Sequence, residues 1–237
     1  MGESLATVQK FDVPLAQATT SSLEALQALS LGNKASREKN PESALPYYER
    51  AIQLDPNFAM AYQNIGGVCF YLGELQRTSE YFTKAFELRE HASEREKLLI
   101  TAAYYANVTG ELDKAAQSSQ ELIGTYPREP SGYVRLALAY GQKGEYERAV
   151  EVSRQVLHFA PDLRGAYGNL GNYLLALQRF QEVRQMLQEQ QARKLEDFLL
   201  HQQIYGLPFL LRDPTAMAEQ LRWFAAANPE AKIMGFG

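Results

Sequence analysis

A period of 34 residues runs through most of this chain and constrains its fold more than any other feature. One row of small or apolar residues recurs at intervals of 34, 37, 34, 34 and 34 residues. Its members are Ala44, Thr78, Ala115, Ala149, Val183 and Met217. A second row keeps the same phase and comprises Tyr48, Phe82, Ser119, Ser153, Leu187 and Leu221. Repeats of this length are typical of stacked supersecondary units. Such stacks mostly serve as binding surfaces.

The two rows divide the chain into six predicted units. Within a unit, apolar residues recur three and four positions apart on both sides of a short turn, which is the pattern of two amphipathic helices. The predicted units are 25–58, 59–92, 96–129, 130–163, 164–197 and 198–231. Residues 93–95 are an insertion, and the whole array covers residues 21–231. We expect residues 1–20 to be an N-terminal tail or connector and residues 232–237 to be a C-terminal tail.

The turn inside each unit carries its own signal. Gly73, Gly110 and Gly144 follow the predicted first helices, where a helix C-terminus favours a positive φ. The fifth unit has Gln178 at this place and departs from the pattern. In the sixth unit Pro208 falls inside the predicted first helix. We expect this proline to kink or shorten that helix, because it lacks the backbone N–H.

Small residues and one cap complete the local pattern. Gly32 and Gly66 lie midway along predicted first helices, and we expect them to let the paired helices approach closely. Ser93 and Glu96 have the spacing of a capping box, in which each side chain bonds to the backbone N–H of the other residue. The insertion is therefore predicted to start a new helix.

These features resemble the tetratricopeptide repeat over about residues 25–231. The resemblance rests on motifs such as Tyr62-x-x-Ile65-Gly66 … Gly73-Glu74 … Phe82-x-x-Ala85 and Tyr133-x-x-Leu136-Ala137 … Gly144-Glu145 … Ala149. It implies an all-α fold, an α-solenoid in the form of a right-handed superhelix with about six helix-turn-helix repeats. It also implies that the first helix of each unit lines a concave inner face.

Three segments resemble the C-terminal repeat region of certain bacterial serine/threonine protein kinases. They are residues 11–26, 55–62 and 93–98. In that family a kinase domain precedes a membrane segment, a small sensor-like domain and the repeats. The kinase domain itself is absent from this chain, which has no His-Arg-Asp, no Asp-Phe-Gly and no glycine-rich loop after a strand. The resemblance implies that this is the repeat part of a larger signalling protein.

Charge and hydropathy exclude several classes of partner. The net charge of −4 and the pI near 5.5 give no basic surface for nucleic acid. No apolar run approaches the roughly 18 residues needed to cross a bilayer, so we expect no membrane insertion. The N-terminus lacks a basic region followed by an apolar stretch, so we expect no signal peptide. The default location is therefore cytoplasmic, whereas the kinase resemblance implies the extracytoplasmic part of a membrane-anchored kinase.

No group of residues indicates catalysis, a metal or a cofactor. The single Cys69 excludes an intrachain disulfide, and its apolar neighbours predict a buried thiol. The histidines, which lie far apart and at no metal-ligand spacing, are His91, His158 and His201. Gly165-x-x-Gly168-x-x-Gly171 lies inside a predicted helix with no strand before it, which favours close packing over phosphate binding. We expect no enzymatic activity.

The remaining candidate site is the concave face that the family resemblance assigns to the first helices. Positions just off their packing stripe are neutral and rather aromatic, which suits a peptide held by apolar pockets and amide hydrogen bonds. The candidate residues are Asn33, Arg37, Gln63, Asn64, Phe70, Tyr71, Lys97, Tyr104, Asn107 and Asn172. The sequence leaves open whether Tyr71 and Tyr104 face a ligand or pack between units.

The carboxylate clamp of chaperone-binding repeats can be compared with these positions. Asn33, Asn64 and Lys97 match the clamp, but Leu29 and Thr101 replace its other two cations. We therefore do not expect capture of a peptide C-terminus. The leading hypothesis is a non-catalytic module that binds a peptide or a partner domain. The alternative is a regulatory or assembly segment of a larger bacterial signalling kinase, which stacks on further repeats or self-associates through its terminal repeat.

Overall fold

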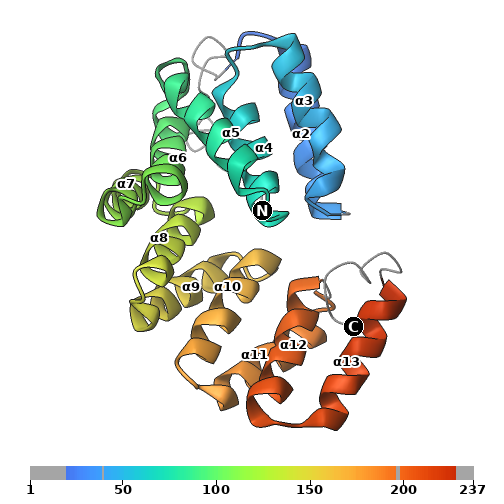
Figure 1. Ribbon diagram of the computed structural model, residues 1–237. Coiled ribbons are helices and arrows are strands. Elements are labelled where there is room, and N and C mark those ends of the chain that lie inside the picture. Colours follow the sequence, from blue (N-terminus) through green and yellow to red (C-terminus); the bar gives the residue numbers. More distant parts are fainter. Residues whose placement is uncertain (1–19, 39, 196–197, 228–237) are drawn as a thin grey trace, which may run out of the picture. The chain divides into compact units, whose positions relative to one another are not determined.

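The computed structural model describes residues 20–38, 40–195 and 198–227. Over these residues the chain consists of helices and turns without a strand (Figure 1). The predicted all-α fold of successive helical pairs is confirmed. The chain divides into two compact units, Met1–Pro127 and Arg128–Gly237.

The first unit contains three helical pairs among its described residues. The pairs are α2 (Leu23–Glu38) with α3 (Leu45–Leu54), α4 (Ala59–Tyr71) with α5 (Leu75–Glu87), and α6 (Glu94–Tyr104) with α7 (Leu112–Thr125). Short turns precede α3 and α6 and extend α6: η2 (Glu42–Ala44), η3 (Arg89–His91) and the π-helical η4 (Tyr105–Thr109). The two helices of each pair pack along each other, and neighbouring pairs touch through α3 with α4 and α5 with α6.

The second unit repeats this arrangement. Its described pairs are α8 (Pro130–Gln142) with α9 (Tyr146–Phe159), α10 (Arg164–Ala176) with α11 (Phe180–Ala192), and α12 (Phe198–Leu211) with α13 (Pro214–Ala227). The first helices of neighbouring pairs also touch directly, α8 with α10 and α10 with α12. The glycines Gly165, Gly168 and Gly171 lie within α10, so they form no loop that could hold a phosphate.

Each of four hairpin turns places one residue in the left-handed backbone conformation, where φ is positive. Gly73, Gly110 and Gly144 have φ values of 75°, 72° and 77°, which confirms the expected turns. In the fifth unit Gln178 itself takes a φ of 56°, and its backbone N–H still donates to the carbonyl of Leu175 at 3.0 Å. The hairpin is therefore kept without the glycine, at a conformational cost of about 1–2 kcal/mol.

An aromatic ring packs on a glycine in the first two hairpins. A Cβ atom added to Gly32 would lie 2.4 Å from Cε1 of Tyr48, and one added to Gly66 would lie 2.7 Å from Cδ1 of Phe82. Both rings are buried, so neither can move aside freely. The small residues predicted from the sequence thus make room for a side chain of the second helix. Without that room the ring could not seat against the first helix.

The insertion at residues 93–95 starts α6 as predicted. The Ser93 hydroxyl accepts the backbone N–H of Glu96 at 3.4 Å, and the Glu96 carboxylate accepts the backbone N–H of Ser93 at 3.1 Å. Two N–H groups that the helix itself leaves unpaired are thereby satisfied. The predicted capping box is confirmed.

Pro208 does not shorten its helix. α12 continues three residues past this proline to Leu211, so the expected shortening is wrong, and the alternative that the proline kinks the helix stays a prediction. Because the proline stands late in α12, only the preceding turn loses a hydrogen bond, and the residues after it still close the turn. The backbone N–H of Asp213 donates to the Pro208 carbonyl at 2.9 Å.

Two neighbouring glycines of α4 allow a matched test of the ring-on-glycine packing. Gly66→Ala should destabilise the fold by about 1–3 kcal/mol, because the new methyl group meets a buried ring. Gly67→Ala should stabilise it by about 0.5–1 kcal/mol, because a Cβ there meets nothing within 4 Å and alanine favours the helix. Urea unfolding of both variants measures the difference. Equal effects at the two positions would contradict this packing.

Candidate functional site

The first helices of the first unit form the surface on which most predicted site residues lie. We call it the first-helix face and define it by Asn33, Arg37, Asn64, Gly67 and Lys97, which belong to α2, α4 and α6. α4 packs directly against α6. α2 and α4 are joined by a hydrogen bond between side chains of this face. The three helices are therefore neighbours on one side of the unit.

Asn33 and Asn64 are brought together in a small network. The Asn64 amide Nδ2 donates to Oδ1 of Asn33 at 3.1 Å, and the Tyr48 hydroxyl donates to the same oxygen at 2.9 Å. Burial raises the pKa of Tyr48 to about 12, although the charge of Arg37 and the hydrogen bond with Asn64 partly oppose this. The two asparagines thus tie α2 to α4, and no pattern in the sequence indicates that Tyr48 anchors them.

Gln63 lies beneath this face with an unsatisfied amide. Its side chain is 3% exposed, and neither Oε1 nor Nε2 has a hydrogen-bond partner. Buried amide groups are almost always paired, so an unpaired one requires a particular explanation. Gly67 stands one helical turn further along α4, and a Cβ built there would meet nothing within 4 Å. Open space therefore adjoins Gly67, one helical turn from Gln63 on α4.

The cations of this face do not form a clamp. Nζ of Lys97 lies 2.6 Å from Oε2 of Glu90, so its charge is already paired. Arg37 is exposed and Leu29 is buried. The expectation that this face does not capture a peptide C-terminus stays a prediction.

The aromatic candidates fall into two groups. Tyr104 stacks on Phe86 of the preceding pair, with ring centroids 4.0 Å apart, and the Arg89 guanidinium lies 3.8 Å from the centroid of Phe86. Tyr104 therefore packs between pairs, which answers the question that the sequence left open for it. Phe70 and Tyr71 are 45% and 43% exposed at the end of α4.

The last two candidates lie apart from the network. Nδ2 of Asn107 donates to the carbonyl of Ala103 on the preceding turn at 2.9 Å, so this amide serves its own helix. Asn172 is exposed on α10, in the second unit. Both positions carry the expected polar side chains, but the structure joins neither to Asn33 and Asn64.

The thiol of Cys69 lies in the core of the first unit. Cys69 is buried as predicted, and burial raises the pKa of its thiol. A thiol with a raised pKa forms little of the reactive thiolate at neutral pH. Among the described residues, no cluster of His, Cys, Asp and Glu could hold a metal ion.

None of the helices in the described part of the chain is long and apolar enough to cross a membrane.

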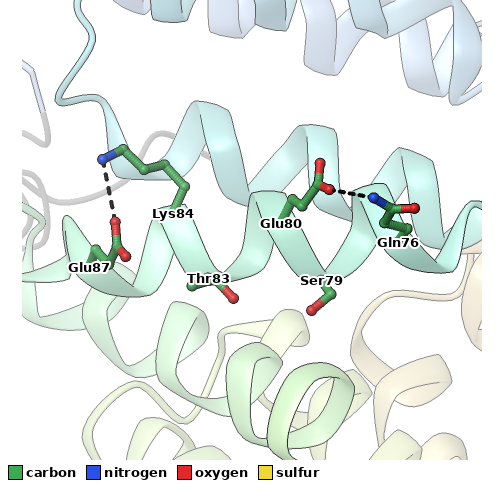
Figure 2. Close-up of a pocket in the computed structure, with 6 residues that line it drawn as sticks. All are labelled: Gln76, Ser79, Glu80, Thr83, Lys84 and Glu87. Carbon is green, nitrogen blue, oxygen red and sulfur yellow. Dashed lines mark hydrogen bonds and ion pairs between the residues drawn. The ribbon is translucent and has the colours of Figure 1, made fainter.

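Two hollows lie away from the first-helix face. One of about 590 Å³ runs along α5, where Gln76 donates to Glu80 at 3.0 Å and Lys84 donates to Glu87 at 3.4 Å (Figure 2). The other, of about 580 Å³, lies among α9, α10 and α11 and is lined by the ion pair of Arg154 with Glu182. The polar groups named here already bond to each other.

Comparison with known proteins supports the resemblance to the tetratricopeptide repeat. A family model of the tetratricopeptide repeat matches residues 29–58 and 130–163. These two segments, in the first and fourth predicted units, are similar to tetratricopeptide repeats. The structure resembles the TPR protein TTC0263 of Thermus thermophilus, with a TM-score of 0.58, 18% identity and coverage of 82% of this chain and 99% of that one. It also resembles PilW, a type IV pilus biogenesis factor, with a TM-score of 0.56, 13% identity and coverage of 86% and 94%. At these identities the likeness establishes the fold alone.

Two longer proteins are similar in sequence. The chain is 27% identical over 134 residues to the BBSome complex member BBS4 homolog of Drosophila melanogaster, and the match covers 53% of this chain. It is 24% identical over 165 residues to the human mitochondrial import receptor subunit TOM70, covering 68% of this chain. The chain spans 27% of the length of each. The matched family is a repeat family rather than a catalytic one, and the resemblance to a kinase stays a prediction.

The buried phenols give the repeats a pH dependence of definite sign. The pKa of Tyr48 and that of Tyr173 rise from 10.0 to about 12 on folding, in both cases chiefly through burial. Below pH 10 these phenols are neutral in both states, and their stabilisation is fully present. Between pH 10 and about 12 the unfolded chain ionises first, so stability is lost as the pH rises.

Urea unfolding from pH 8 to 12 measures this effect. The midpoint should stay level up to about pH 10 and then fall. Tyr48→Phe should make the fall shallower, and it should also lower stability at neutral pH by about 1 kcal/mol through loss of the hydrogen bond to Asn33. Tyr47→Phe, at an exposed neighbouring position, is the control. A fall of the same steepness in both variants would contradict the assignment to Tyr48.

Proposed function

We propose that this chain binds a peptide segment of a partner protein on the first-helix face of its first unit, without catalysis. The observation that carries the proposal is the amide of Gln63, which is buried on both polar atoms and bonded on neither. Leaving such a group unsatisfied costs about 1–3 kcal/mol. A ligand that pairs with the Gln63 amide would explain why the chain keeps a group that weakens its fold.

The chemistry of the unpaired amide matches a peptide main chain. A glutamine side chain offers one acceptor oxygen and two N–H donors, which pair with the N–H and C=O of a single extended residue. α4 carries no charged residue, so a ligand backbone can lie along it without removing an ion from water. Gly67 has no side chain to block the approach.

The surroundings hold this position in place before a ligand arrives. Asn33, Asn64 and Tyr48 bond to one another and fix α2 against α4. The stacked pair of Phe86 and Tyr104 fixes α5 against α6. A face whose side chains are already ordered loses little entropy on binding, which favours affinity for a flexible peptide.

The comparisons support protein binding at a general level. One relative is named as a receptor subunit for mitochondrial import and the other as a member of a protein complex. The alternative function, a regulatory or assembly segment of a bacterial signalling kinase, stays a prediction, as do its location beyond a membrane and its self-association.

Selection from a random peptide display library tests the proposal, and the selected peptide is then titrated against variants. Gln63→Met replaces the amide by an apolar chain of similar length. It should weaken binding by about 5–150-fold, the equivalent of 1–3 kcal/mol, while making the fold more stable. Gln76→Met on α5 makes the same change at an exposed position and should leave affinity unchanged. Equal affinity for the unmodified chain and Gln63→Met would disprove the assignment.

A variant with a bulky side chain at position 67 tests the same site in a second way. Gly67→Leu should fold, because open space surrounds that position, and it should abolish binding by filling the approach to Gln63. Gly124→Leu on α7 is the matched control, since a Cβ at Gly124 also meets nothing within 4 Å. If both variants bind the selected peptide equally well, the ligand lies elsewhere.

A further inference from the structure

Thr20 fixes the point at which the preceding chain meets the first unit. This residue is 4% exposed, and its hydroxyl donates to Oδ2 of Asp55 at 2.5 Å. The same hydroxyl accepts the backbone N–H of Ser22 at 3.0 Å, next to the start of α2. Asp55 directly follows α3, and its carbonyl accepts the backbone N–H of Phe58, the residue before α4. The chain that precedes Thr20 therefore starts close to the first turn of α4.

Residues 13–19, which lie outside the described part of the chain, are long enough to follow α4. We call them the leading segment. An extended chain advances about 3.3 Å per residue, so a segment of this length spans about 23 Å. α4 has 13 residues, which correspond to about 20 Å. From Thr20, the leading segment can therefore pass Gly67 and reach the level of Phe70 and Tyr71.

The leading segment and α4 match in their chemistry. The segment reads Val-Pro-Leu-Ala-Gln-Ala-Thr and contains no charged residue, and α4 contains none either. Pro14 lacks freedom in φ and favours an extended conformation of Val13, the residue before it. Val13 and Leu15 supply apolar side chains for the end of α4, where Phe70 and Tyr71 are 45% and 43% exposed. An extended, uncharged ligand is the kind that the proposed site favours.

Charged residues on the helices beside α4 do not oppose this placement. Lys97 on α6 is paired with Glu90 at 2.6 Å, and Arg77 on α5 is paired with Glu74 at 2.6 Å. Arg37 is exposed near the end of α2 and keeps its water. Because the leading segment carries no charge, it can lie along α4 without bringing a like charge close to any of these groups.

We infer that the leading segment binds along α4 of its own chain and competes there with a partner peptide. The inference rests on the proposed function, because it names the regulation of that site. Since the segment is tethered at Thr20, its effective concentration at α4 is on the order of millimolar. A segment with an intrinsic dissociation constant of about 0.1 mM would then weaken the binding of an outside peptide about tenfold. A partner has to displace the segment before it binds.

Disulfide cross-linking of the full chain tests this placement. Gly67→Cys, where a Cβ meets nothing within 4 Å, is combined in turn with Val13→Cys, Leu15→Cys and Gln17→Cys, which share one face of an extended segment. Gly124→Cys on α7 is the control, because a Cβ there is equally unobstructed. In dilute solution at least one pair with Gly67→Cys should close about tenfold faster than its counterpart with Gly124→Cys, since cysteines cross-link only when they come close. The native thiol is buried and is the same in all variants.

A binding experiment tests the competition. The probe is a synthetic peptide of residues 11–20, blocked at both ends, labelled with a dye and titrated with the full chain. The double variant Val13→Asp with Leu15→Asp should bind this probe about tenfold more tightly than the unmodified chain, because its charged segment no longer occupies the uncharged helix. Leu5→Asp with Val8→Asp makes the same change outside the leading segment and should leave the affinity unchanged.

The outcomes distinguish this inference from the proposed function. Equal cross-linking rates to Gly67→Cys and Gly124→Cys, or disulfides that form only between chains, would overturn the inference. Equal affinity of the probe for the unmodified chain and for Val13→Asp with Leu15→Asp would overturn it as well. In each case a displayed peptide whose binding depends on Gln63 leaves the proposed function in place. If neither the probe nor any displayed peptide binds the double variant, both fail.

Discussion

The packing of an aromatic ring on a glycine is the contact on which the other features depend. In the first two hairpins a ring of the second helix occupies the space that a Cβ would fill at Gly32 or Gly66. The same contact recurs between pairs, where a Cβ added to Gly141 on α8 would lie 2.4 Å from Cε1 of Tyr173 on α10. Each ring buries a large apolar area against a helix backbone. This fixes which face of α2, α4 and α8 points inward.

The orientation of the helices separates the charges of the protein. The second helices α5, α7 and α9 each follow a glutamate that pairs with a cation three residues later, as Glu74 does with Arg77 at 2.6 Å. Such exposed pairs contribute little to stability, but they use up the ionic groups on that side of each pair. Among the first helices, α4 has no charge at all, whereas α2 and α6 carry charged residues near their ends. Under the proposed function, a peptide that lies along α4 would therefore remove few ions from water.

Much of this fold follows from the sequence because the contacts that define it repeat. Every 34 residues the same steric requirement recurs, so the turns at Gly73 and Gly144, the cap at Ser93 and the helical pairs could all be predicted. The backbone conformations at Gln178 and Pro208 were harder to predict. A backbone held in place on both sides tolerates a residue that disfavours the local conformation. The site was predicted in part. Asn33 and Asn64 lie together, but the burial of Gln63 and the stacking of Tyr104 depend on neighbours that no spacing specifies.

The group that carries the proposed function could not be found by periodicity, because it does not break the pattern. Gln63 occupies an ordinary position on a first helix. What distinguishes it is a missing partner, which is a property of the folded surroundings. A scaffold that repeats one contact many times has stability spread over all its units. It therefore tolerates an unsatisfied polar group, and under the proposed function a partner with complementary hydrogen bonds would offset the cost of that group.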